Sequence, residues 1–406
     1  MNPAVQPAAS PAAGAPAPAP LLPGATLGVL GGGQLGRMFV HAAQRLGYRT
    51  VVLDPDADSP AGLVAHCHLR AAYLDAAALG ELAHCADAVT TEFENVPADA
   101  LAALAASRRV APAADAVAVC QDRAREKAHF ARSGIACAPH AVIADETALE
   151  RVDASLFPGI LKTARFGYDG KGQVGVSERG GLRDAWHALG GAPCVLERRL
   201  PIAVEASVIV ARGADGACVA LPVQQNLHRG GILAVTRVPA PDLDDETADA
   251  AARAARRIAA TLRYVGVLCV EFFVLEDGSL VANEMAPRPH NSGHYSVDAC
   301  DVSQFELQVR ALAGLPLVMP RLHSPAVMLN LLGDLWHDRD PRRAGSLRDP
   351  DWVRVLALPG AHLHLYGKSQ ARPGRKMGHL TFTADTAGEA ESQARAAAEL
   401  LGIGAW

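Results

Sequence analysis

The chain has 406 residues, half of them apolar, and a formal net charge of -5 at pH 7. This length predicts two or three domains, and the acidic balance argues against a general nucleic-acid binder or a polybasic membrane anchor. No uninterrupted apolar stretch approaches the roughly 20 residues that span a bilayer, and the eight cysteines contain no Cys-x-x-Cys pair. We therefore expect a cytoplasmic protein with reduced thiols that binds neither nucleic acid nor membrane.

Residues 1–23 are dominated by Ala and Pro and contain no Lys or Arg. This composition is unlike a signal or transit peptide and predicts a disordered tail over residues 1–24. A short apolar strand follows at Thr26–Leu30, and then Gly31–Gly36 matches the dinucleotide-binding pattern G-x-G-x-x-G. A helix and a second strand at Tyr48–Leu53 complete a βαβ unit, which predicts a Rossmann-like domain.

The glycine pattern taken alone favours an NAD-dependent oxidoreductase. Glycines at this turn also allow close helix–strand packing, however, and nothing later in the chain resembles a hydride-transfer site. We therefore treat the oxidoreductase as the weaker interpretation. A further strand, Ala88–Phe93, brings Glu92 and Glu94 to its carboxyl end, where parallel sheets bind ligands. A solvated loop explains these two acids nearly as well.

A lysine-bearing strand and a glycine-rich loop come next. The β-prone run Gly159–Thr163 places Lys162 on a strand, and the segment from Gly167 to Gly175 contains four glycines in nine positions. Backbone N–H groups in such a loop can wrap an anionic group. The spacing differs from the Walker pattern, and an ordinary hairpin turn is the alternative.

Two glutamates flank an Asp-Gly turn farther along the chain. Asp277-Gly278 predicts a hairpin with a two-residue loop. Glu271 and Glu284 are each six residues from that loop, so we expect them to face each other with Cβ atoms about 5 Å apart. Because like charges destabilise a hairpin, the pair predicts a hard cation, Mg²⁺ or else Mn²⁺, bound together with substrate phosphates. The alternative is a slipped register that leaves one glutamate in solvent.

Polar residues between these motifs extend the predicted site. Glu197 lies near the end of one short strand and is followed by Arg198, Arg199 and Leu200, and Glu205 lies near the start of an alternating strand. A strand edge that ends in an acid can read an adenine amino group and ribose hydroxyls. His228 follows an apolar strand, where a hydrogen-bonded loop histidine is the alternative to a ligand. With Lys162, the glycine loop and the glutamate pair, these are the parts that a Mg-ATP site requires.

In their order along the chain, the motifs resemble those of the ATP-grasp superfamily and, within it, the 5-(carboxyamino)imidazole ribonucleotide synthases of purine biosynthesis. The resemblance extends from about residue 25 to about residue 380. It is carried by GGGQLGRM (31–38), TTEFENVP (90–97), GYDGKGQ (167–173), NEMAPR (283–288), HNSGH (290–294), SQFEL (303–307) and RPGRKMGH (372–379).

The resemblance implies an α/β and α+β multidomain protein. It places a Rossmann-like (pre-ATP-grasp) domain at residues 25–125, an ATP-grasp domain with a glycine-loop subdomain at 126–318, and a small C-terminal domain at 319–406. ATP is then expected between the two lobes of the ATP-grasp domain. A homodimer is implied as well.

The resemblance also assigns residues to ligands. It implies that ATP is bound by Arg123, Lys162, Gly167, Tyr168, Asp169, Gly170, Lys171, Gly172, Gln173, Glu197, Arg198, Arg199, Leu200, Glu205, His228, Asn283 and Glu284. Glu271 and Glu284 become the Mg²⁺ ligands. Aminoimidazole ribonucleotide is implied to contact Tyr168, Asp169, Arg288, His290, Asn291, Ser292, His294, Lys368 and Arg375, and the catalytic roles fall to Arg288, Lys162 and Asp169.

One position departs from the wider superfamily, in which many members carry an Asn ligand two residues after the second glutamate. Here that residue is Ala286, which we interpret as a feature of the subgroup. The implied reaction phosphorylates bicarbonate with Mg-ATP to give carboxyphosphate, and then carboxylates the 5-amino group of aminoimidazole ribonucleotide. Another ATP-grasp carboxylate–amine ligase, a non-catalytic nucleotide sensor and the NAD-dependent oxidoreductase are the alternatives.

Overall fold

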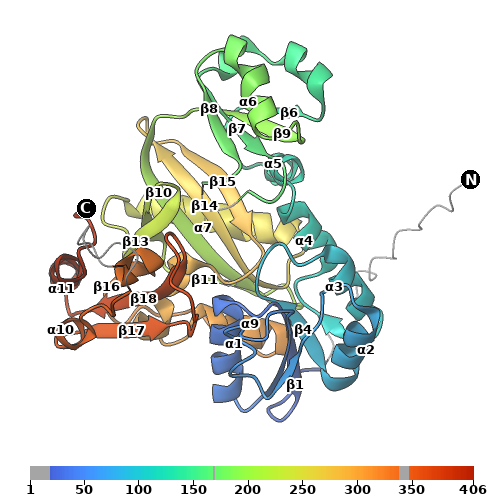
Figure 1. Ribbon diagram of the computed structural model, residues 1–406, viewed down its shortest axis with the longest axis vertical. Coiled ribbons are helices and arrows are strands. Elements are labelled where there is room, and N and C mark those ends of the chain that lie inside the picture. The colour runs from blue at the N-terminus through green and yellow to red at the C-terminus, as the bar shows by residue number, and fades with distance from the viewer. Residues whose placement is uncertain (1–18, 168–169, 338–346) are drawn as a thin grey trace, which may run out of the picture.

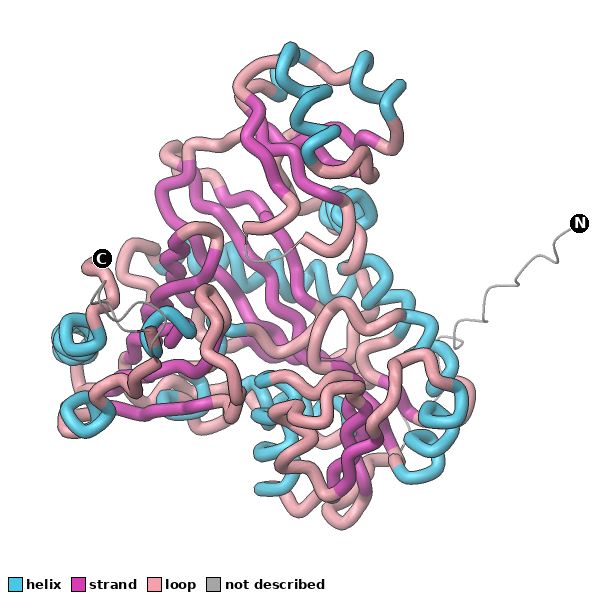
Figure 2. Tube along the Cα trace, in the orientation of Figure 1, coloured by secondary structure: helices cyan, strands magenta, loops and turns pink. Residues whose placement is uncertain are grey.

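The computed structural model of the chain, shown in Figure 1, describes residues 19–167, 170–337 and 347–406. Most of the predicted tail over residues 1–24 lies outside the described residues, as do Tyr168 and Asp169. The described residues form sheets of five, nine and four strands with helices on their faces (Figure 2). This mixed α/β architecture confirms the predicted fold class. Every helix in these three ranges is too short or too polar to cross a membrane.

The five-stranded sheet of the N-terminal part is parallel, as a Rossmann-like domain requires. Along β1 the apolar side chains alternate, so that Leu27 and Val29 pack under α1 while Leu30 packs on the opposite face. The strand order is β3-β2-β1-β4-β5. The elements are β1 (Thr26–Leu30), α1 (Gln34–Arg45), β2 (Arg49–Leu53), β3 (Cys67–Leu69), α2 (Ala76–Cys85), β4 (Ala88–Thr91), α3 (Ala98–Ala105), β5 (Arg109–Val110) and α4 (Ala114–Cys120).

The nine-stranded sheet forms the centre of the molecule and continues into the C-terminal part (Figure 1). Its order is β15-β14-β10-β12-β13-β16-β18-β17, with β11 paired to β10, so β15 is an edge strand. The strands are β10 (Ile202–Arg212), β11 (Cys218–Ala220), β12 (Gln224–Arg229), β13 (Ile232–Val238), β14 (Gly266–Leu275), β15 (Leu280–Ala286), β16 (Ala326–Leu332), β17 (Ala361–Leu365) and β18 (Lys376–Thr383).

Helices cover both faces of the large sheet. Apolar residues of α7 pack against β10 and β14 on one face, and α9 packs between this sheet and α1 of the N-terminal part. Farther along, α11 covers β16 and β18. The helices are α5 (Arg123–Arg132), α7 (Asp245–Thr261), α8 (Ser296–Ala299), α9 (Gln304–Ala313), α10 (Trp352–Leu356) and α11 (Ala387–Leu401), with short 3₁₀ turns at Asn291–Gly293 (η4) and Gly333–Trp336 (η5).

The four-stranded antiparallel sheet is the small lobe at the top of Figure 1, above the strands β14 and β15. Its order is β6-β9-β7-β8, and α6 packs on it through a core that includes Leu182 and Trp186. The elements are β6 (His140–Ile143), η1 (Glu146–Arg151), η2 (Ala154–Leu156), β7 (Gly159–Thr163), β8 (Gln173–Val176), η3 (Arg179–Gly181), α6 (Leu182–Ala188) and β9 (Cys194–Arg198).

Candidate active site

The loop of the β14–β15 hairpin is longer than the sequence predicts. Leu275 donates its N–H to the Ser279 carbonyl at 2.9 Å, so the loop consists of the three residues Glu276–Gly278. Gly278 has a φ of 81°, which is the left-handed conformation that closes a three-residue loop. The expected two-residue loop is therefore wrong.

The register of the two glutamates is nevertheless the predicted one. A three-residue loop alone would place Glu271 opposite Asn283, but the register shifts by one residue between Phe272 and Glu271. The shift is a β-bulge in which Asn283 is the extra residue. Glu271 consequently pairs with Glu284, on the edge of the large sheet that faces the small lobe.

Different charges surround the two carboxylates. Burial and the facing carboxylate of Glu284 raise the pKa of Glu271 to about 7. Burial alone would also raise the pKa of Glu284, but Arg123 and Lys162 lower it below its ordinary value. The Nη1 atom of Arg123 lies 3.1 Å from Glu284 Oε2. Two facing carboxylates with a remaining repulsion fit a hard divalent cation, which combines such ligands with phosphate oxygens.

His290 adds a neutral imidazole to this pair. Its Nδ1 atom accepts the backbone N–H of Ser292 at 3.3 Å, so the ring proton lies on Nε2. That Nε2 atom is 3.3 Å from Glu271 Oε1. Burial lowers the pKa of His290 well below its ordinary value, and the ring stays uncharged. His290 therefore presents an N–H group to the carboxylate of Glu271, whereas Glu284 is paired with the guanidinium group of Arg123.

Lys162 lies on β7 and pairs with Glu197 on the neighbouring strand β9. The Lys162 Nζ atom donates to Glu197 Oε2 at 2.8 Å, and the Lys127 Nζ atom lies 3.1 Å from Glu197 Oε1. Burial would raise the pKa of Glu197, but the two lysines lower it to about 2. Arg198, Arg199 and Leu200 follow directly, and the Arg199 N–H donates to the Pro158 carbonyl at 2.9 Å.

Two further predicted nucleotide residues, Glu205 and His228, lie on β10 and β12 of the large sheet. Glu205 and His228 are joined by a short hydrogen bond through His228 Nδ1. Burial would lower the pKa of His228, but Glu205 and Glu271 raise it. The nearby carboxylates thus favour the protonated form of this histidine. The structure brings Glu205 and His228 together with Glu271, on the face of the sheet next to the small lobe.

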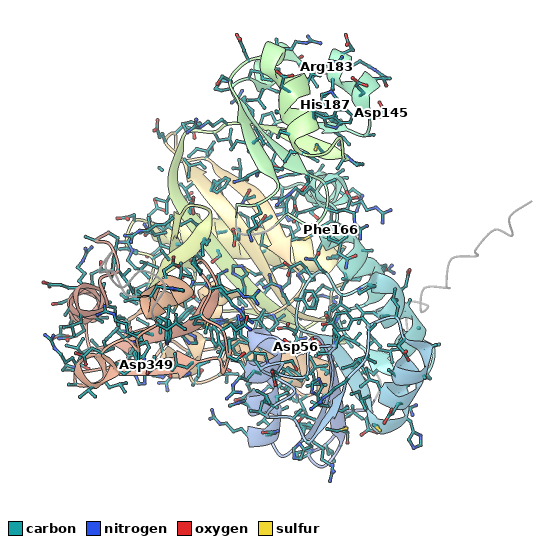
Figure 3. The ribbon with its side chains drawn as sticks, viewed as in Figure 1. Asp56, Asp145, Phe166, Arg183, His187 and Asp349 are labelled. Carbon is teal, nitrogen blue, oxygen red and sulfur yellow. The ribbon has the colours of Figure 1, made fainter. Side chains whose placement is uncertain are left out.

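The glycine loop connects β7 and β8 and reaches the large sheet. Gly170 and Gly172 have φ values of 76° and 71°, which residues with a Cβ atom adopt only with strain. A Cβ atom on Gly170 would lie 3.1 Å from the Gly230 carbonyl in the β12–β13 turn, so the loop touches the other lobe. Phe166, which is 68% exposed, begins the loop between the two sheets (Figure 3).

Arg288 follows β15 and is paired with a residue of the N-terminal part. Its Nε atom makes a short hydrogen bond to Glu94, beyond the carboxyl end of β4. Burial would raise the pKa of Glu94, but Arg288 lowers it. Lys368 and Arg375 lie on the loop between β17 and β18, where they donate to the Lys376 and Gln370 carbonyls at 2.7 and 2.9 Å.

Three other predicted substrate residues lie in the interior. Ser292 accepts a hydrogen bond from Ser207 at 2.8 Å, and His294 accepts one from Gln304 at 3.1 Å. Both are fully buried. Asn291 is also buried, and neither side-chain atom has a hydrogen-bond partner among the described residues.

The glycine turn before α1 is occupied by a side chain of the protein itself. The carboxylate of Glu92 accepts the N–H groups of Gly33 and Gly36 at 2.9 and 3.1 Å, at the positive end of the helix. Burial raises the pKa of Glu92 despite these bonds. Because Glu92 takes the position that a dinucleotide pyrophosphate would need, the geometry does not support the oxidoreductase.

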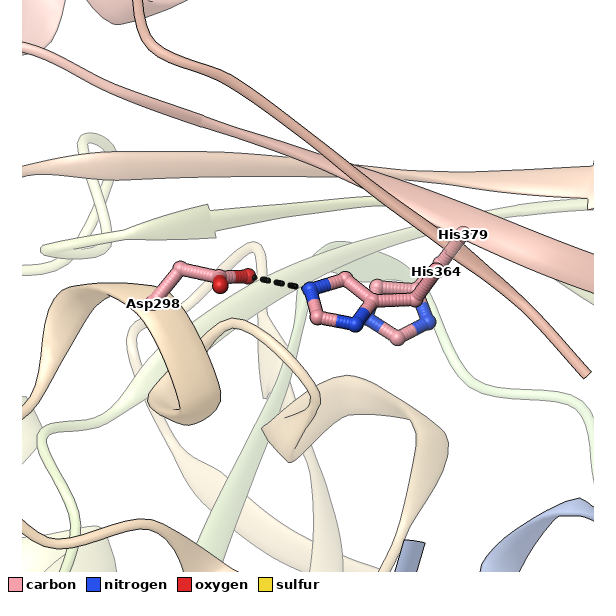
Figure 4. A group of neighbouring side chains, drawn as sticks. All are labelled: Asp298, His364 and His379. Atoms are coloured by element: carbon pink, nitrogen blue, oxygen red, sulfur yellow. Dashed lines mark hydrogen bonds and ion pairs between the residues drawn. The ribbon is translucent and has the colours of Figure 1, made fainter.

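Asp298, His364 and His379 form a second cluster with potential metal ligands (Figure 4). His364 Nε2 lies 2.8 Å from Asp298 Oδ2, and the rings of His364 and His379 stack with centroids 4.5 Å apart at 10°. In nearly parallel rings the in-plane lone pairs do not converge on one point. Tyr366 also holds His379 Nδ1 at 2.9 Å, so we interpret the cluster as hydrogen-bonded packing.

Comparison with known proteins places the chain in a family. Family models match at residues 24–121 (ribonucleotide synthetase preATP-grasp domain), 128–305 (ATP-grasp domain) and 326–393 (phosphoribosylaminoimidazole carboxylase C-terminal domain). An N5-carboxyaminoimidazole ribonucleotide synthase of Brucella melitensis is 46% identical over 364 residues, which are 89% of this chain and 97% of that protein. The chain belongs to the N5-carboxyaminoimidazole ribonucleotide synthase family.

Further N5-carboxyaminoimidazole ribonucleotide synthases agree with this assignment. The Bacillus subtilis protein is 40% identical over 89% of this chain and 92% of its own length. A Staphylococcus aureus enzyme solved with ADP has a TM-score of 0.83 at 38% identity and covers 93% of this chain and 98% of its own. An Aspergillus clavatus enzyme solved with ADP and 5-aminoimidazole ribonucleotide has a TM-score of 0.84 at 32% identity, with coverages of 93% and 99%.

Two buried titratable side chains beside the site of this synthase-family chain were not predicted from the sequence. Glu126 and Lys127 lie on α5, and their side chains contact β15 and β9. The available signal was their spacing: Arg123, Glu126 and Lys127 are three and four residues apart in a predictable helix, and such residues share one face. Their partners could not be identified, because β15 lies more than a hundred residues later in the chain.

Proposed function

We propose that this chain carboxylates the 5-amino group of 5-aminoimidazole ribonucleotide with bicarbonate, in an ATP-dependent reaction of purine biosynthesis. The observation that carries the proposal is the facing pair Glu271 and Glu284. The pair is placed between the small lobe, which carries Lys162, and the loop between β17 and β18, called the basic C-terminal loop because it carries Lys368 and Arg375. Membership of the synthase family and the use of ATP by ATP-grasp enzymes support it.

We assign ATP to the space between the small lobe and the large sheet. Lys162 and Arg123 supply positive charge for the phosphates, and the N–H groups of the loop Gly167–Gln173 close over them. Glu197, Leu200 and Glu205 are assigned to the base and ribose, with His228 next to Glu205. The remaining members of this assignment are Arg198, Arg199 and Asn283.

Glu271 and Glu284 are the residues that would hold Mg²⁺, or Mn²⁺ in its place. When bound, the cation would offset the charge of the transferring phosphoryl group. Ala286 provides no third side-chain ligand, so the remaining ligands would have to come from phosphate and water. His290 orients Glu271 by placing its Nε2–H group against that carboxylate.

The chemistry proceeds in two displacements. A bicarbonate oxygen attacks the γ-phosphorus of ATP, the bond to the β-phosphate oxygen breaks, and ADP leaves. The 5-amino nitrogen of the ribonucleotide then forms a bond to the carboxyl carbon of carboxyphosphate, or of CO₂ released from it. The bond between this carbon and the phosphate oxygen breaks, phosphate leaves, and the nitrogen loses a proton. Arg288 is assigned to orient bicarbonate, because a guanidinium group binds a planar oxyanion through two N–H donors.

The ribonucleotide is assigned to the surface between the large sheet and the basic C-terminal loop. Lys368 and Arg375 suit its phosphate, since charge-assisted hydrogen bonds from Lys and Arg are strong. Tyr168 and Asp169, which lie outside the described residues, are assigned to the same substrate, together with His290, Asn291, Ser292 and His294. Asp169 and Lys162 complete the proposed catalytic set with Arg288.

Release of ADP tests this function directly. Purified protein is incubated with Mg-ATP and bicarbonate, with and without 5-aminoimidazole ribonucleotide. Strong stimulation by the ribonucleotide is expected. Turnover without stimulation would indicate an ATP-grasp ligase with another acceptor, and an absence of turnover would contradict the proposal.

We further propose a cytoplasmic homodimer, as the family resemblance implies. Sedimentation equilibrium of the purified chain of 42.3 kDa is expected to give twice that mass, and a monomer at micromolar concentration would contradict this.

A further inference from the structure

One face of α5 contacts three consecutive residues of β15, one contact for each residue. Lys127 Nζ donates to the Asn283 carbonyl at 2.8 Å, Arg123 Nη1 donates to Glu284 Oε2 at 3.1 Å, and the Met285 N–H donates to Glu126 at 2.6 Å. Arg123, Glu126 and Lys127 are aligned along the helix because residues three and four apart are neighbours on its surface. The helix thus holds the strand on both sides of Glu284.

The backbone of β15 needs such partners because β15 is an edge strand. The Asn283 carbonyl and the Met285 N–H bond to α5 on the side away from β14. On that side the described residues add no further strand to the sheet, and only Cys137 makes a single bridge, to Ala282. Asn283 is also the bulge residue that brings Glu284 opposite Glu271. The contact of Lys127 therefore falls at the residue on which the pairing of the two carboxylates depends.

Both helix residues are buried titratable groups, so their positions are closely determined. Lys127 is 0% exposed and Glu126 is 2% exposed. A buried charge destabilises a protein unless it is paired and hydrogen-bonded. Lys127 satisfies this requirement with Glu197 and the Asn283 carbonyl. Burial raises the pKa of Glu126 to about 8 despite the nearby charges of Lys127 and Arg123, and its side chain accepts the Met285 N–H.

Lys127 also connects the two lobes. Glu197 on β9 of the small lobe has Lys162 on one carboxylate oxygen and Lys127 on the other. The charge of Glu197 is therefore balanced from both lobes, by Lys162 of the small lobe and by Lys127 of α5. One buried ammonium group thus links the small lobe to the metal-bearing strand.

We propose that Glu126 and Lys127 are positioning residues that clamp the backbone around Glu284 and so set the geometry of the carboxylate pair for the metal–nucleotide complex. This inference rests on the proposed function for the identity of the ligand, Mg-ATP. It goes beyond that function by assigning a role to two side chains that are placed to act through β15.

The test compares Lys127→Met and Glu126→Leu with Lys127→Arg, Glu126→Gln and the control Arg125→Met. Arg125 lies on the same helix but is exposed. The first readout is binding of Mn²⁺ in the presence of ADP, measured by electron paramagnetic resonance. The second is the Mg²⁺ concentration that gives half-maximal ADP formation, and the third is Tm.

We expect the apolar variants to weaken Mn²⁺–ADP binding and to raise the Mg²⁺ requirement by about tenfold or more, as for loss of a charge-assisted hydrogen bond. Glu126→Gln keeps an acceptor for the Met285 N–H and Lys127→Arg keeps a donor, so both should retain most of the affinity. Arg125→Met should match the wild type. If the apolar variants do not fold, Glu126→Asp takes their place. Its side chain is one methylene group shorter, and it is expected to show the same weakening of Mn²⁺–ADP binding.

A lower Tm with unchanged Mn²⁺ binding would mean that the two residues only stabilise the fold, and this would overturn the inference. The outcome is separable from that of the proposed function. If the wild type binds Mn²⁺–ADP but the ribonucleotide does not stimulate turnover, the function fails while weakened binding in the variants still supports the clamp.

Discussion

Glu271 and Glu284 face each other across the β14–β15 hairpin because two deviations from a simple hairpin cancel. The loop is one residue longer than Asp277-Gly278 predicts, and the bulge at Asn283 shifts the register back by one. Side chains alternate between the two faces of a strand, so either deviation alone would have separated the carboxylates. Their pairing is therefore a specific feature of this hairpin.

The first prediction concerns the two carboxylates that are proposed as metal ligands. Glu284→Gln removes the charge of one proposed ligand while keeping its size, and we expect ADP formation to fall by about a hundredfold or more, as when one preorganised electrostatic contact to the reacting group is lost. Circular dichroism should show an unchanged fold. Glu276→Gln, in the exposed loop of the same hairpin, is the control. Near-normal turnover of Glu284→Gln would remove the metal assignment.

The second prediction separates the two substrate sites. Arg375→Ala removes a proposed donor to the ribonucleotide phosphate, so the KM for the ribonucleotide should rise about tenfold or more while the KM for ATP changes little. Initial rates with each substrate varied in turn provide the measurement. Arg354→Ala, an exposed arginine of α10 in the same part of the chain, should have no effect. Equal changes in both KM values would count against the phosphate role.

The third prediction concerns the glycine loop as a lid. Arg165 and Lys171 are exposed trypsin sites in and beside the loop, and closure over the nucleotide phosphates should slow cleavage at both. Limited proteolysis with and without Mg²⁺ and a non-hydrolysable ATP analogue, read by mass spectrometry, measures the effect. Cleavage after Arg151, which is exposed on η1 of the same lobe, should not change. Unaltered cutting after Arg165 and Lys171 would contradict the lid.

The fourth prediction follows from the pKa of Glu197, which Lys162 and Lys127 depress, against the effect of burial, from 4.5 to about 2. A carboxyl group whose pKa is lower in the folded than in the unfolded state stabilises the fold at pH values above its unfolded pKa. This stabilisation is lost as pH falls toward the folded pKa. Glu197→Gln should therefore lower Tm clearly at pH 7, by an amount that shrinks as pH falls from about 5 to 3.

Thermal melts of the wild type and Glu197→Gln across this range provide the measurement. Breaking a buried ion pair by removing one partner costs about 3 kcal/mol or more, so the effect at pH 7 should be large. The exposed Glu178→Gln should give no comparable difference. A Tm difference that stays constant with pH would show that the charge of Glu197 is not the source of its stabilisation.

The parts that the sequence predicts well are those with local signals. Lys162 on a strand, the glycines with positive φ and the first βαβ unit all depend on short-range backbone preferences. Glu92 shows where such signals end, because the G-x-G-x-x-G pattern describes the turn but not the group that occupies it. That group belongs to the residue directly after β4, and its contact exists only once β1 and β4 are paired.

The features of the site that the sequence does not predict depend on contacts between distant segments of the chain. The partner of Arg288 is Glu94, from another domain, and the partners of Glu126 and Lys127 lie on β15 and β9. No periodicity relates these segments, so their meeting is determined by packing of the three sheets. The three-residue loop was missed for a different reason, since an Asp-Gly pair is compatible with loops of more than one length.

The register of the β14–β15 hairpin is held at the bulge and by α5, several residues away from the loop tip Glu276–Gly278, which is exposed. The tip is consequently a natural position for engineering. A short flexible peptide or a fluorescent tag inserted between Asp277 and Gly278 should be tolerated with little loss of ADP formation. It would place a reporter on the strand pair that carries both carboxylates, so that closure of the small lobe could be followed in solution.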